Sequence, residues 1–505
     1  MTKAQSRPLL IEIGVEEIPA GVSRQLYEAL CQEIGSLLAT NGISPNAPTL
    51  SQAFTPRRLL YYQKACPTRQ ADRDEVVWGP PESVAYRDGR PTPAAEGFAK
   101  KNGLSVGDFT LEDKGDGKGR YMKAVVHRPG RATAEILAEA MPGILRRLPS
   151  PKRMKWNDGE ARDDAFIRPV RWIVARLGDT VIPFSFAGVG SGKLSRGHRI
   201  LGGEGEIDID DPKKWLKAQH VMLQQGERMK HIDSVMAKAA GYVPDYALLE
   251  EVADLTEWPV PILCEFDEKF VVLPREVIRI TLKNHQRCFL VGDSSNKFFA
   301  VANIKHKGKK DQQTVAKGNA RVVNARLSDA MFYFDRDPKQ TLDARVERLN
   351  DIIFQDGLGT VGDQVARLRN FVLDAAGAIG ADANTVQRAA YLCKSDLTTG
   401  LVGEFPELQG YMGGIYAHLQ GEPEGVAKAI AEHYRPAGAE DALPATPEAR
   451  LIAVAERADK LLGYFHLGRI PTASADPYGL RRAAIGLIRL LADQQMPVEL
   501  TLTRV

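Results

Sequence analysis

Apolar and polar positions alternate near the N-terminus with the period of a strand and then with the period of a helix. Residues 9–15 alternate isoleucine and valine with glutamate and glycine, which predicts a half-buried strand. Residues 21–39 repeat leucine at helical spacing and predict a helix with one apolar side. From about 53 to 210, and again from about 248 to 304, short apolar runs are separated by glycine and proline. This first portion is therefore expected to be α+β.

Strand signals disappear after about Arg326, and helical spacing continues to the end. The segment 341–354 predicts a helix with one apolar stripe, made of Leu342, Val346, Leu349 and Ile353. Asp476 and Pro477 have the form of a helix N-cap followed by proline at the first helical position. The helix after them is expected to bury Leu480, Ala484, Leu487, Ile488 and Leu491. We place the boundary between an α+β portion and an all-α portion near 326–345.

Length and composition indicate a globular chain of several domains. The chain has 505 residues, which at about 150 residues per domain predicts roughly three domains. The hydrophobic fraction of 44% and the charged fraction of 26% exclude a mainly disordered or fibrous protein. No apolar run approaches the roughly 18 residues of a membrane span, and Glu12, Glu16 and Glu17 interrupt the N-terminal apolar segment. We expect a cytoplasmic protein without membrane partners.

The five cysteines agree with a reducing compartment. They are odd in number and widely scattered, and no C-x-x-C pair occurs among them. We therefore expect free thiols that act as small buried apolar residues, and no zinc site.

Basic residues are concentrated in two stretches. The net charge is only +3, yet residues 275–326 hold twelve Lys or Arg against three acids. A second basic stretch covers 152–176. Four rings are interleaved with these charges, namely Trp156, Trp172, His285 and Phe289. Cations beside aromatic rings, which are expected to stack on unpaired bases, favour a polyanion such as RNA, although a solvated charged face is the alternative.

Residues 187–194 resemble a phosphate loop but depart from its pattern. Ala187 stands where the first glycine is needed, and Leu194 replaces the hydroxyl that would hold magnesium. We expect a flexible turn here, and the chain shows no recognisable ATP site.

Ser195, Arg196, His198 and Arg199 form a compact cluster of polar side chains. Three interpretations stay open for it: RNA backbone binding, a structural turn, and a catalytic base at His198. A histidine between two arginines should be kept neutral by like charge. No carboxylate lies nearby in sequence to orient the ring.

The segments 273–291 and 318–334 carry further candidates. Residues 273–291 are expected to begin as a helix and then become extended, and they offer Lys283, His285 and Arg287 as phosphate donors. The alternative is a solvated helix end. Arg321 and Arg326 lie on a predicted helix. The aromatic residues 332–334 are interpreted as core.

The helical portion lacks the sequence pattern of a catalytic metal site. Phosphohydrolases of the HD class need a His-Asp dipeptide, and none of the nine histidines precedes an aspartate. Asp396 and Asp459 are left as carboxylates without an imidazole partner, which is a weak set for a catalytic divalent ion.

Longer segments are more specific than single residues. In the first half they read LLIEIGVEEIPA, FTPRRL, PKRMKW, FIRPVRWIVARLG and SRGHRI. Around the middle they read LTEWPVPILCEFDEKFVVLPREV, KNHQR and GNARVVNARLSDAMFYFDRD. In the helical half they read YLCKSDLTTGLVGEFPELQGYMGGIYA, AIAEHYRP and ADPYGLRRAAIGLIRL. Together, and in this order, they resemble the β subunit of the bacterial heterotetrameric glycyl-tRNA synthetase.

The resemblance implies a division of labour. A β subunit of this family binds tRNA(Gly), and a separate α subunit in an α2β2 complex uses ATP, Mg and glycine. No cofactor is then expected on this chain, and no catalytic residue or metal. The implied fold is an N-terminal segment over 1–52, a B3/B4-like α+β tRNA-binding region over 53–335 and a helical HD-like domain over 336–505. The C-terminal anticodon-binding domain of the family is expected to be absent, and Asp396 and Asp459 are degenerate HD carboxylates.

We therefore predict a tRNA-binding subunit of glycine–tRNA ligase. The expected tRNA contacts are Lys152, Arg153, Lys155, Arg168, Arg171, Arg196, His198, Arg199, Lys283, His285, Arg287, Arg321 and Arg326. Two alternatives stay open: a metal-dependent HD-type phosphohydrolase, and an assembly scaffold without tRNA affinity.

Overall fold

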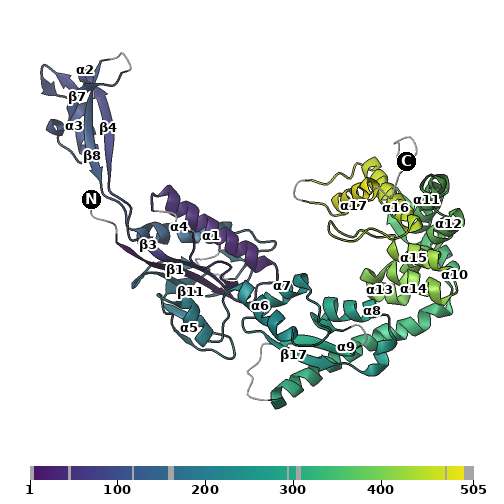
Figure 1. The fold of residues 1–505 in the computed structure, drawn as a ribbon. Helices are drawn as coiled ribbons and strands as arrows, with labels where there is room; N and C mark the ends of the chain where they lie inside the picture. Colours follow the sequence, from purple (N-terminus) through teal and green to yellow (C-terminus); the bar gives the residue numbers. More distant parts are fainter. Residues whose placement is uncertain are drawn as a thin grey trace. The chain divides into compact units, whose positions relative to one another are not determined.

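The computed structural model divides the chain into two compact units. It describes residues 5–43, 47–115, 119–156, 164–292, 295–302, 309–472 and 475–493. The N-terminal unit comprises 1–238, 244–261 and 301–307. The C-terminal unit comprises 239–243, 262–300 and 308–505. The first is rich in strands and the second in helices, so the expected mixed fold is confirmed at this level (Figure 1). Among the described residues no helix is long and apolar enough to cross a membrane.

A seven-stranded sheet forms the centre of the N-terminal unit. Its order is β13-β14-β11-β1-β3-β2, with β12 paired to β11. The strands are β1 (Ser6–Val15), β2 (Phe54–Thr55), β3 (Arg58–Pro67), β11 (Val170–Leu177), β12 (Thr180–Val181), β13 (Ser185–Phe186) and β14 (Val189–Gly192). Strand β1 is antiparallel to both neighbours, with Ile11 opposite Tyr61 on one side and Ala175 on the other.

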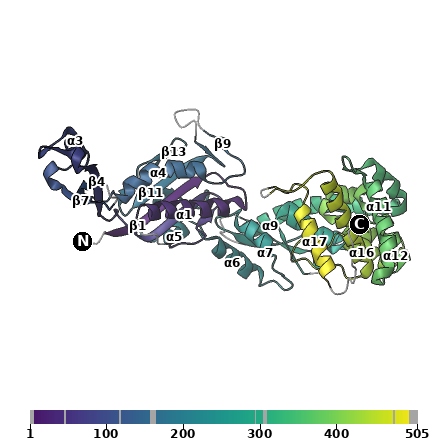
Figure 2. The same ribbon diagram turned by 90° about the horizontal axis from the view of Figure 1, so that it is seen from above.

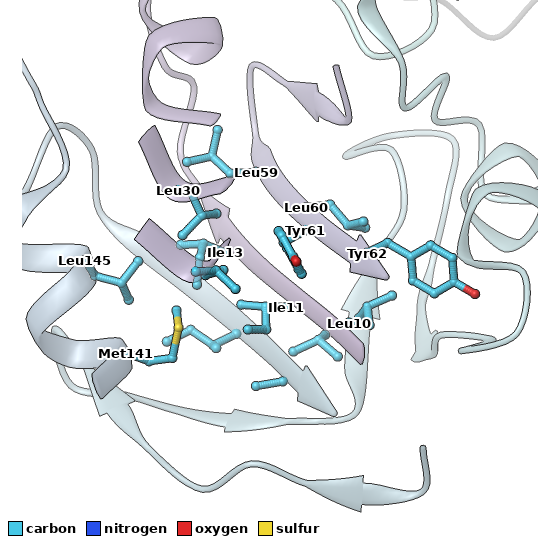
Figure 3. Packing of buried hydrophobic residues seen from close by; sticks show 14 of the residues in the cluster. Leu10, Ile11, Ile13, Leu30, Leu59, Leu60, Tyr61, Tyr62, Met141 and Leu145 are labelled. Atoms are coloured by element: carbon cyan, nitrogen blue, oxygen red, sulfur yellow. The ribbon is translucent and has the colours of Figure 1, made fainter. Parts of the chain in front are cut away.

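Helices cover both faces of this sheet. Helices α1 (Val22–Thr40) and α4 (Thr133–Arg147) lie on one face and α5 (Pro212–Ala218) on the other (Figures 1 and 2). Leu30 of α1 and Met141 of α4 pack on the apolar side chains of β1 and β3 (Figure 3). The predicted helix is confirmed as α1. The expectation of a half-buried strand is wrong, because β1 is central and its residues 9–15 are buried on both faces.

A smaller sheet in the same unit has its own core. It pairs β4 (Arg73–Pro81), β8 (Arg120–Arg128) and β7 (Thr110–Asp113), with α2 (Glu82–Ala85) and α3 (Pro93–Lys101) packed on it (Figure 1). Phe109, Met122 and Ala124 are buried against Ala95 and Ala99 of α3. The unit also contains the pairs β5 (Tyr86–Arg87) and β6 (Arg90–Pro91), β9 (Met154–Lys155) and β10 (Ala165–Phe166), and β15 (Leu194–Arg196) and β16 (Glu204–Glu206). Helices α6 (Gln225–Met236) and α7 (Tyr246–Ala253) follow.

Three strands between residues 260 and 302 form a further sheet. Its order is β17-β19-β18, from β17 (Val260–Glu265), β19 (Lys297–Ala302) and β18 (Phe289–Val291). Helix α8 (Arg275–Ile280) continues into a π-helical turn, η3 (Thr281–His285), before β18. The predicted change from helix to extended chain over 273–291 is thereby confirmed.

Helices build the rest of the C-terminal unit. They are α9 (Lys309–Arg336), α10 (Leu342–Val346), α11 (Val361–Ala375), α12 (Ala383–Leu392), α13 (Gly400–Glu404), α14 (Tyr411–Leu419), α15 (Glu424–Glu432), α16 (Pro447–His466) and α17 (Leu480–Ala492). Helices α16 and α17 lie side by side (Figure 2). Short 3-10 helices, such as η4 (Asp337–Lys339) and η5 (Glu347–Asp351), connect them.

Two sequence expectations fail between residues 341 and 360. Strands do not disappear after Arg326, because β20 (Ile353–Gln355) pairs with β21 (Gly359–Thr360). Residues 341–354 are not one helix, since α10 gives way to η5 and then β20, and Ile353 is 76% exposed.

Helix α17 begins three residues later than its cap pattern predicts. Asp476 does cap it, because its carboxylate accepts hydrogen bonds from the amides of Leu480 and Arg481. The buried face comprises Leu480, Ala483, Gly486 and Leu490. Ile488, which the sequence predicted to be buried, is 65% exposed. After Leu480, the buried positions each precede a predicted position by one residue.

Candidate nucleic-acid interface

The thirteen candidate contacts are divided between the two units. The N-terminal unit holds Lys152, Arg153, Lys155, Arg168, Arg171, Arg196, His198 and Arg199. The C-terminal unit holds Lys283, His285, Arg287, Arg321 and Arg326. The candidates therefore fall into two groups, one in each unit.

Three predicted arginines meet at the end of β1. Arg171 Nε lies 3.1 Å from Glu16 Oε1, and Arg199 pairs with both Glu16 and Glu17. Arg168 Nε donates to the carbonyl of Glu17 at 2.9 Å. Sequence reasoning missed the two glutamates as partners. These carboxylates orient the guanidinium groups while leaving Arg171 and Arg199 about half exposed.

A buried ion network lies inside the same sheet. Arg58 is fully buried and reaches Glu12 Oε1 at 2.8 Å and Glu257 Oε1 at 3.0 Å. Burial alone would raise the pKa of Glu257, but the charges of Arg58 and Arg57 outweigh it and hold that pKa below its usual value. The sequence gives no local sign of this network, because Glu12 and Glu257 lie far from Arg58 along the chain. The network fixes the strands that carry the exposed arginines.

Trp172 belongs to the core and not to a stacking surface. Its side chain is 5% exposed, and the guanidinium groups of Arg57, Arg58 and Arg196 lie 5.3–5.5 Å from the ring centroid. A Cβ added at Gly14 would come within 1.9 Å of the indole, so the neighbouring strand must carry glycine there. The expectation that this ring stacks on RNA bases is wrong. Phe289 is likewise buried, at 3% exposed.

His198 is a buried part of a turn. Its Nδ1 accepts hydrogen bonds from the amides of Ile200 and Leu201 at 3.3 and 3.2 Å. Burial, with a contribution from Arg57, lowers the pKa of the imidazole, although Glu257 acts in the opposite direction. Glu257, which lies far away in the sequence, is thus a carboxylate that acts electrostatically on this ring. A neutral imidazole that accepts hydrogen bonds from backbone amides fits the interpretation of this segment as a structural turn.

The basic residues of the 152–155 segment lie at the surface. Lys152 and Lys155 are exposed, and Arg153 donates to the carbonyls of Arg146 and Leu148. Trp156 follows β9 and donates from Nε1 to the carbonyl of Phe166 at 3.0 Å. Residues 157–163 lie outside the described residues.

The glycine-rich segment 187–194 is mainly strand. It contributes β14, which pairs with β13, and the start of β15, which pairs with β16. Ala187 has φ 50°, and its amide donates to Asp164 Oδ2 at 2.8 Å. The expected flexible turn is corrected to paired strands, and no helix follows the segment as a phosphate loop requires.

In the C-terminal unit the candidates lie at η3 and on α9. Arg287 is exposed, and the His285 ring packs edge-on to Phe405 at 5.1 Å. Arg321 is exposed, and Arg326 lies 3.4 Å from Glu404. The interpretation of residues 332–334 as core is wrong for Phe332, which is 56% exposed. The basic stretch 275–326 is described only in part, since 293–294 and 303–308 lie outside the described residues.

Asp396 and Asp459 occupy different surroundings. Asp459 pairs with Arg367 and lines a cavity of about 630 Å³ together with Arg367, Asp374 and His466. Asp396 is wholly buried, and its Oδ2 accepts from the amides of Gly410 and Gly413 at 2.6 and 3.0 Å. Burial raises the pKa of Asp396 to about 6. Within the described ranges no group of three or more His, Cys, Asp or Glu side chains could hold a metal ion, and nothing favours the phosphohydrolase alternative.

The expectation of free thiols is confirmed, and the expectation of burial holds for four of the five. All five thiols are free, four are buried and Cys31 is half-buried. Burial raises the pKa of Cys66 and Cys264 to about 11.

Comparison with known proteins identifies the family. The model of the glycyl-tRNA synthetase beta subunit matches residues 9–504. A glycine–tRNA ligase beta subunit of Pseudomonas fluorescens is 39% identical over 98% of this chain and 72% of its own length. Those of Citrifermentans bemidjiense and Geobacter metallireducens are 40% and 39% identical, each over 97% of this chain and 72% of their own length. The chain belongs to the family of glycyl-tRNA synthetase beta subunits, part of an aminoacyl-tRNA synthetase.

Proposed function

We propose that this chain holds tRNA(Gly) electrostatically while an α subunit carries the adenylation and the transfer of glycine. Family membership implies both partners, and the observation that carries the proposal is the exposed cations of each unit. Lys152 and Lys155 in the N-terminal unit and Arg287 and Arg321 in the C-terminal unit are exposed. Binding of phosphates by such side chains releases condensed counterions, which provides affinity without base recognition.

Positioning is the catalytic contribution in this account. The tRNA 3′ end must meet an activated glycine in attack geometry, and orientation alone can lower a barrier by several kcal/mol, of the order of 7–11 in favourable cases. The absence of a phosphate-loop pattern at 187–194 supports the assignment of ATP and Mg to the α subunit. The buried ion network around Arg58 supplies the rigidity that positioning needs.

The finer division of the chain is part of the same proposal. It assigns 1–52 to an N-terminal segment, 53–335 to a B3/B4-like tRNA-binding region and 336–505 to an HD-like helical domain in which Asp396 and Asp459 are remnants. The pairing of Asp459 with Arg367 supports the loss of a metal role there. The complex is proposed to be an α2β2 assembly in the cytoplasm.

The contacts are tested by removing one exposed cation from each unit. We expect Lys152→Gln with Arg321→Gln to weaken tRNA(Gly) binding and to lower the slope of log K against log salt by about 1.4–1.8, at about 0.7–0.9 per lost phosphate contact. Filter binding or fluorescence anisotropy at several salt concentrations measures this slope. Lys217→Gln with Lys428→Gln removes the same charge from exposed sites outside the candidate set. An unchanged slope in the first variant removes both residues from the interface, and a wild-type chain that ignores tRNA at low ionic strength contradicts the proposed function itself.

A further inference from the structure

A basic hollow in the C-terminal unit lies apart from the predicted contacts. Its volume is about 460 Å³, and it lies where the end of α9, η4, α10 and the loop before α13 come together. Its lining residues are Tyr333, Arg336, Asp337, Lys339, Gln340, Arg345, Arg348, Thr398, Thr399 and Gly400. Four basic side chains therefore surround one carboxylate.

Three of the four cations are free to meet a ligand. Arg336, Lys339 and Arg348 are exposed, and the ion pairs among the described residues include none of them. The guanidinium of Arg336 lies 5.8 Å from the ring centroid of Phe332, a contact that orients the group but uses none of its N–H donors. Like charges gathered without carboxylate partners repel one another, and an anion between them relieves that repulsion.

Arg345 forms the buried base of the hollow. It is 5% exposed, and its Nη1 donates to the carbonyl of Thr398 at 3.0 Å and its Nη2 to the carbonyl of Asp337 at 2.9 Å. Its Nε is buried and has no hydrogen-bond partner. Arg345 is therefore held by the protein itself, and it adds its positive charge to that of the three exposed cations.

The one carboxylate that lines the hollow, Asp337, is engaged by hydrogen bonds within the protein. Asp337 accepts hydrogen bonds from the amides of Gly400 and Leu401 at 2.9 Å each and from the Tyr416 hydroxyl at 3.1 Å. It is 5% exposed, and its Oδ1 lies 3.6 Å from Arg345 Nη2. The negative charge of Asp337 is therefore balanced by donors of the protein itself. The ring of Tyr333 lies directly against Gly400 in the lining of the hollow. A Cβ added at Gly400 would come within 2.2 Å of that ring.

We propose that this hollow, the Arg336–Arg348 pocket, binds a phosphate group, and that the phosphate belongs to the tRNA backbone. Guanidinium groups match phosphate oxygens with paired N–H donors, and the volume suits a nucleotide-sized group. The choice of tRNA as the source rests on the proposed function. A free nucleotide or inorganic polyphosphate offers the same chemistry from a second source.

The test compares two probes on the full chain. Arg336→Gln with Arg348→Gln removes two exposed cations and leaves Arg345 and Asp337 in place. We expect a slope of log K against log salt for tRNA(Gly) lower by about 1.4–1.8, and binding of inorganic tripolyphosphate at least about tenfold weaker by calorimetry. Arg369→Gln with Lys428→Gln is the matched control, because both residues are exposed in the same unit and outside the pocket. The control should bind both probes as the wild type does.

The possible results distinguish between the phosphate site, the source of the phosphate and the proposed function. Weaker tRNA binding with a lower slope in the pocket variant supports the site and its RNA source. Loss of tripolyphosphate binding with tRNA binding unchanged supports the phosphate site and assigns it to a free phosphate compound. If the wild type binds tripolyphosphate but no tRNA, the proposed function fails and the site stands. A pocket variant that matches the control with both probes overturns the inference.

Discussion

Arg58→Met should destabilise the central sheet of the N-terminal unit by about 3–5 kcal/mol, the usual cost of leaving a buried charge without its partner. The guanidinium is fully buried between Glu12 and Glu257. Methionine fills much of the space but neutralises neither carboxylate. Glu257 would keep Arg57 at 3.4 Å and Thr55 at 2.7 Å, whereas Glu12 would lose its ion-pair partner. Native-state hydrogen exchange of β1 and β3 amides measures the local loss of stability.

Arg171→Met is the control for this prediction. It removes the same group from the same sheet, but Arg171 is 53% exposed in its pair with Glu16. An exposed pair contributes about 0–1 kcal/mol, so exchange in β1 and β3 should change little. Equal effects of the two substitutions would show that burial of the Arg58 network does not stabilise the sheet.

Asp337→Ala should destabilise the C-terminal unit by a similar amount, about 3–5 kcal/mol. The substitution leaves the amides of Gly400 and Leu401 and the hydroxyl of Tyr416 without their acceptor. It also removes the carboxylate beside the buried Arg345, whose pKa is already lowered by burial. Hydrogen exchange over α13 and α14, together with thermal unfolding of the full chain, measures the effect.

Asp335→Ala provides the comparison, because Asp335 is exposed two residues earlier on α9. Its removal should change stability by no more than about 0.5 kcal/mol, as for most surface substitutions. If Asp337→Ala were equally mild, the hydrogen bonds that it accepts would not hold α13 in place.

The periodicity of apolar residues predicted those elements that depend mainly on their own sequence. The spacing of leucines identified α1 to within one residue at each end, and the alternation in residues 9–15 identified β1. It could not show that β1 is central, because burial of its second face depends on α5, some 200 residues later. At 341–354 a helical spacing was overridden when residues 353–355 paired with β21.

The candidate site was predictable in residue type but not in arrangement. The basic segments indicated phosphate binding, yet sequence distance hid the pairing of Arg171 and Arg199 with Glu16. The same distance hid Glu257 as the partner of Arg58 and the neighbour of His198. Aromatic residues between cations suggested stacking, but Trp172 and Phe289 fill the core because a large apolar ring gains more from burial than from exposure.

Glycylation of tRNA(Gly) by this chain alone, by the α subunit alone and by their mixture tests the central claim most directly. The account assigns tRNA binding to this chain and bond formation to the other, so neither should produce glycyl-tRNA by itself, and the mixture should. Glycyl-tRNA formed by this chain alone would contradict the account.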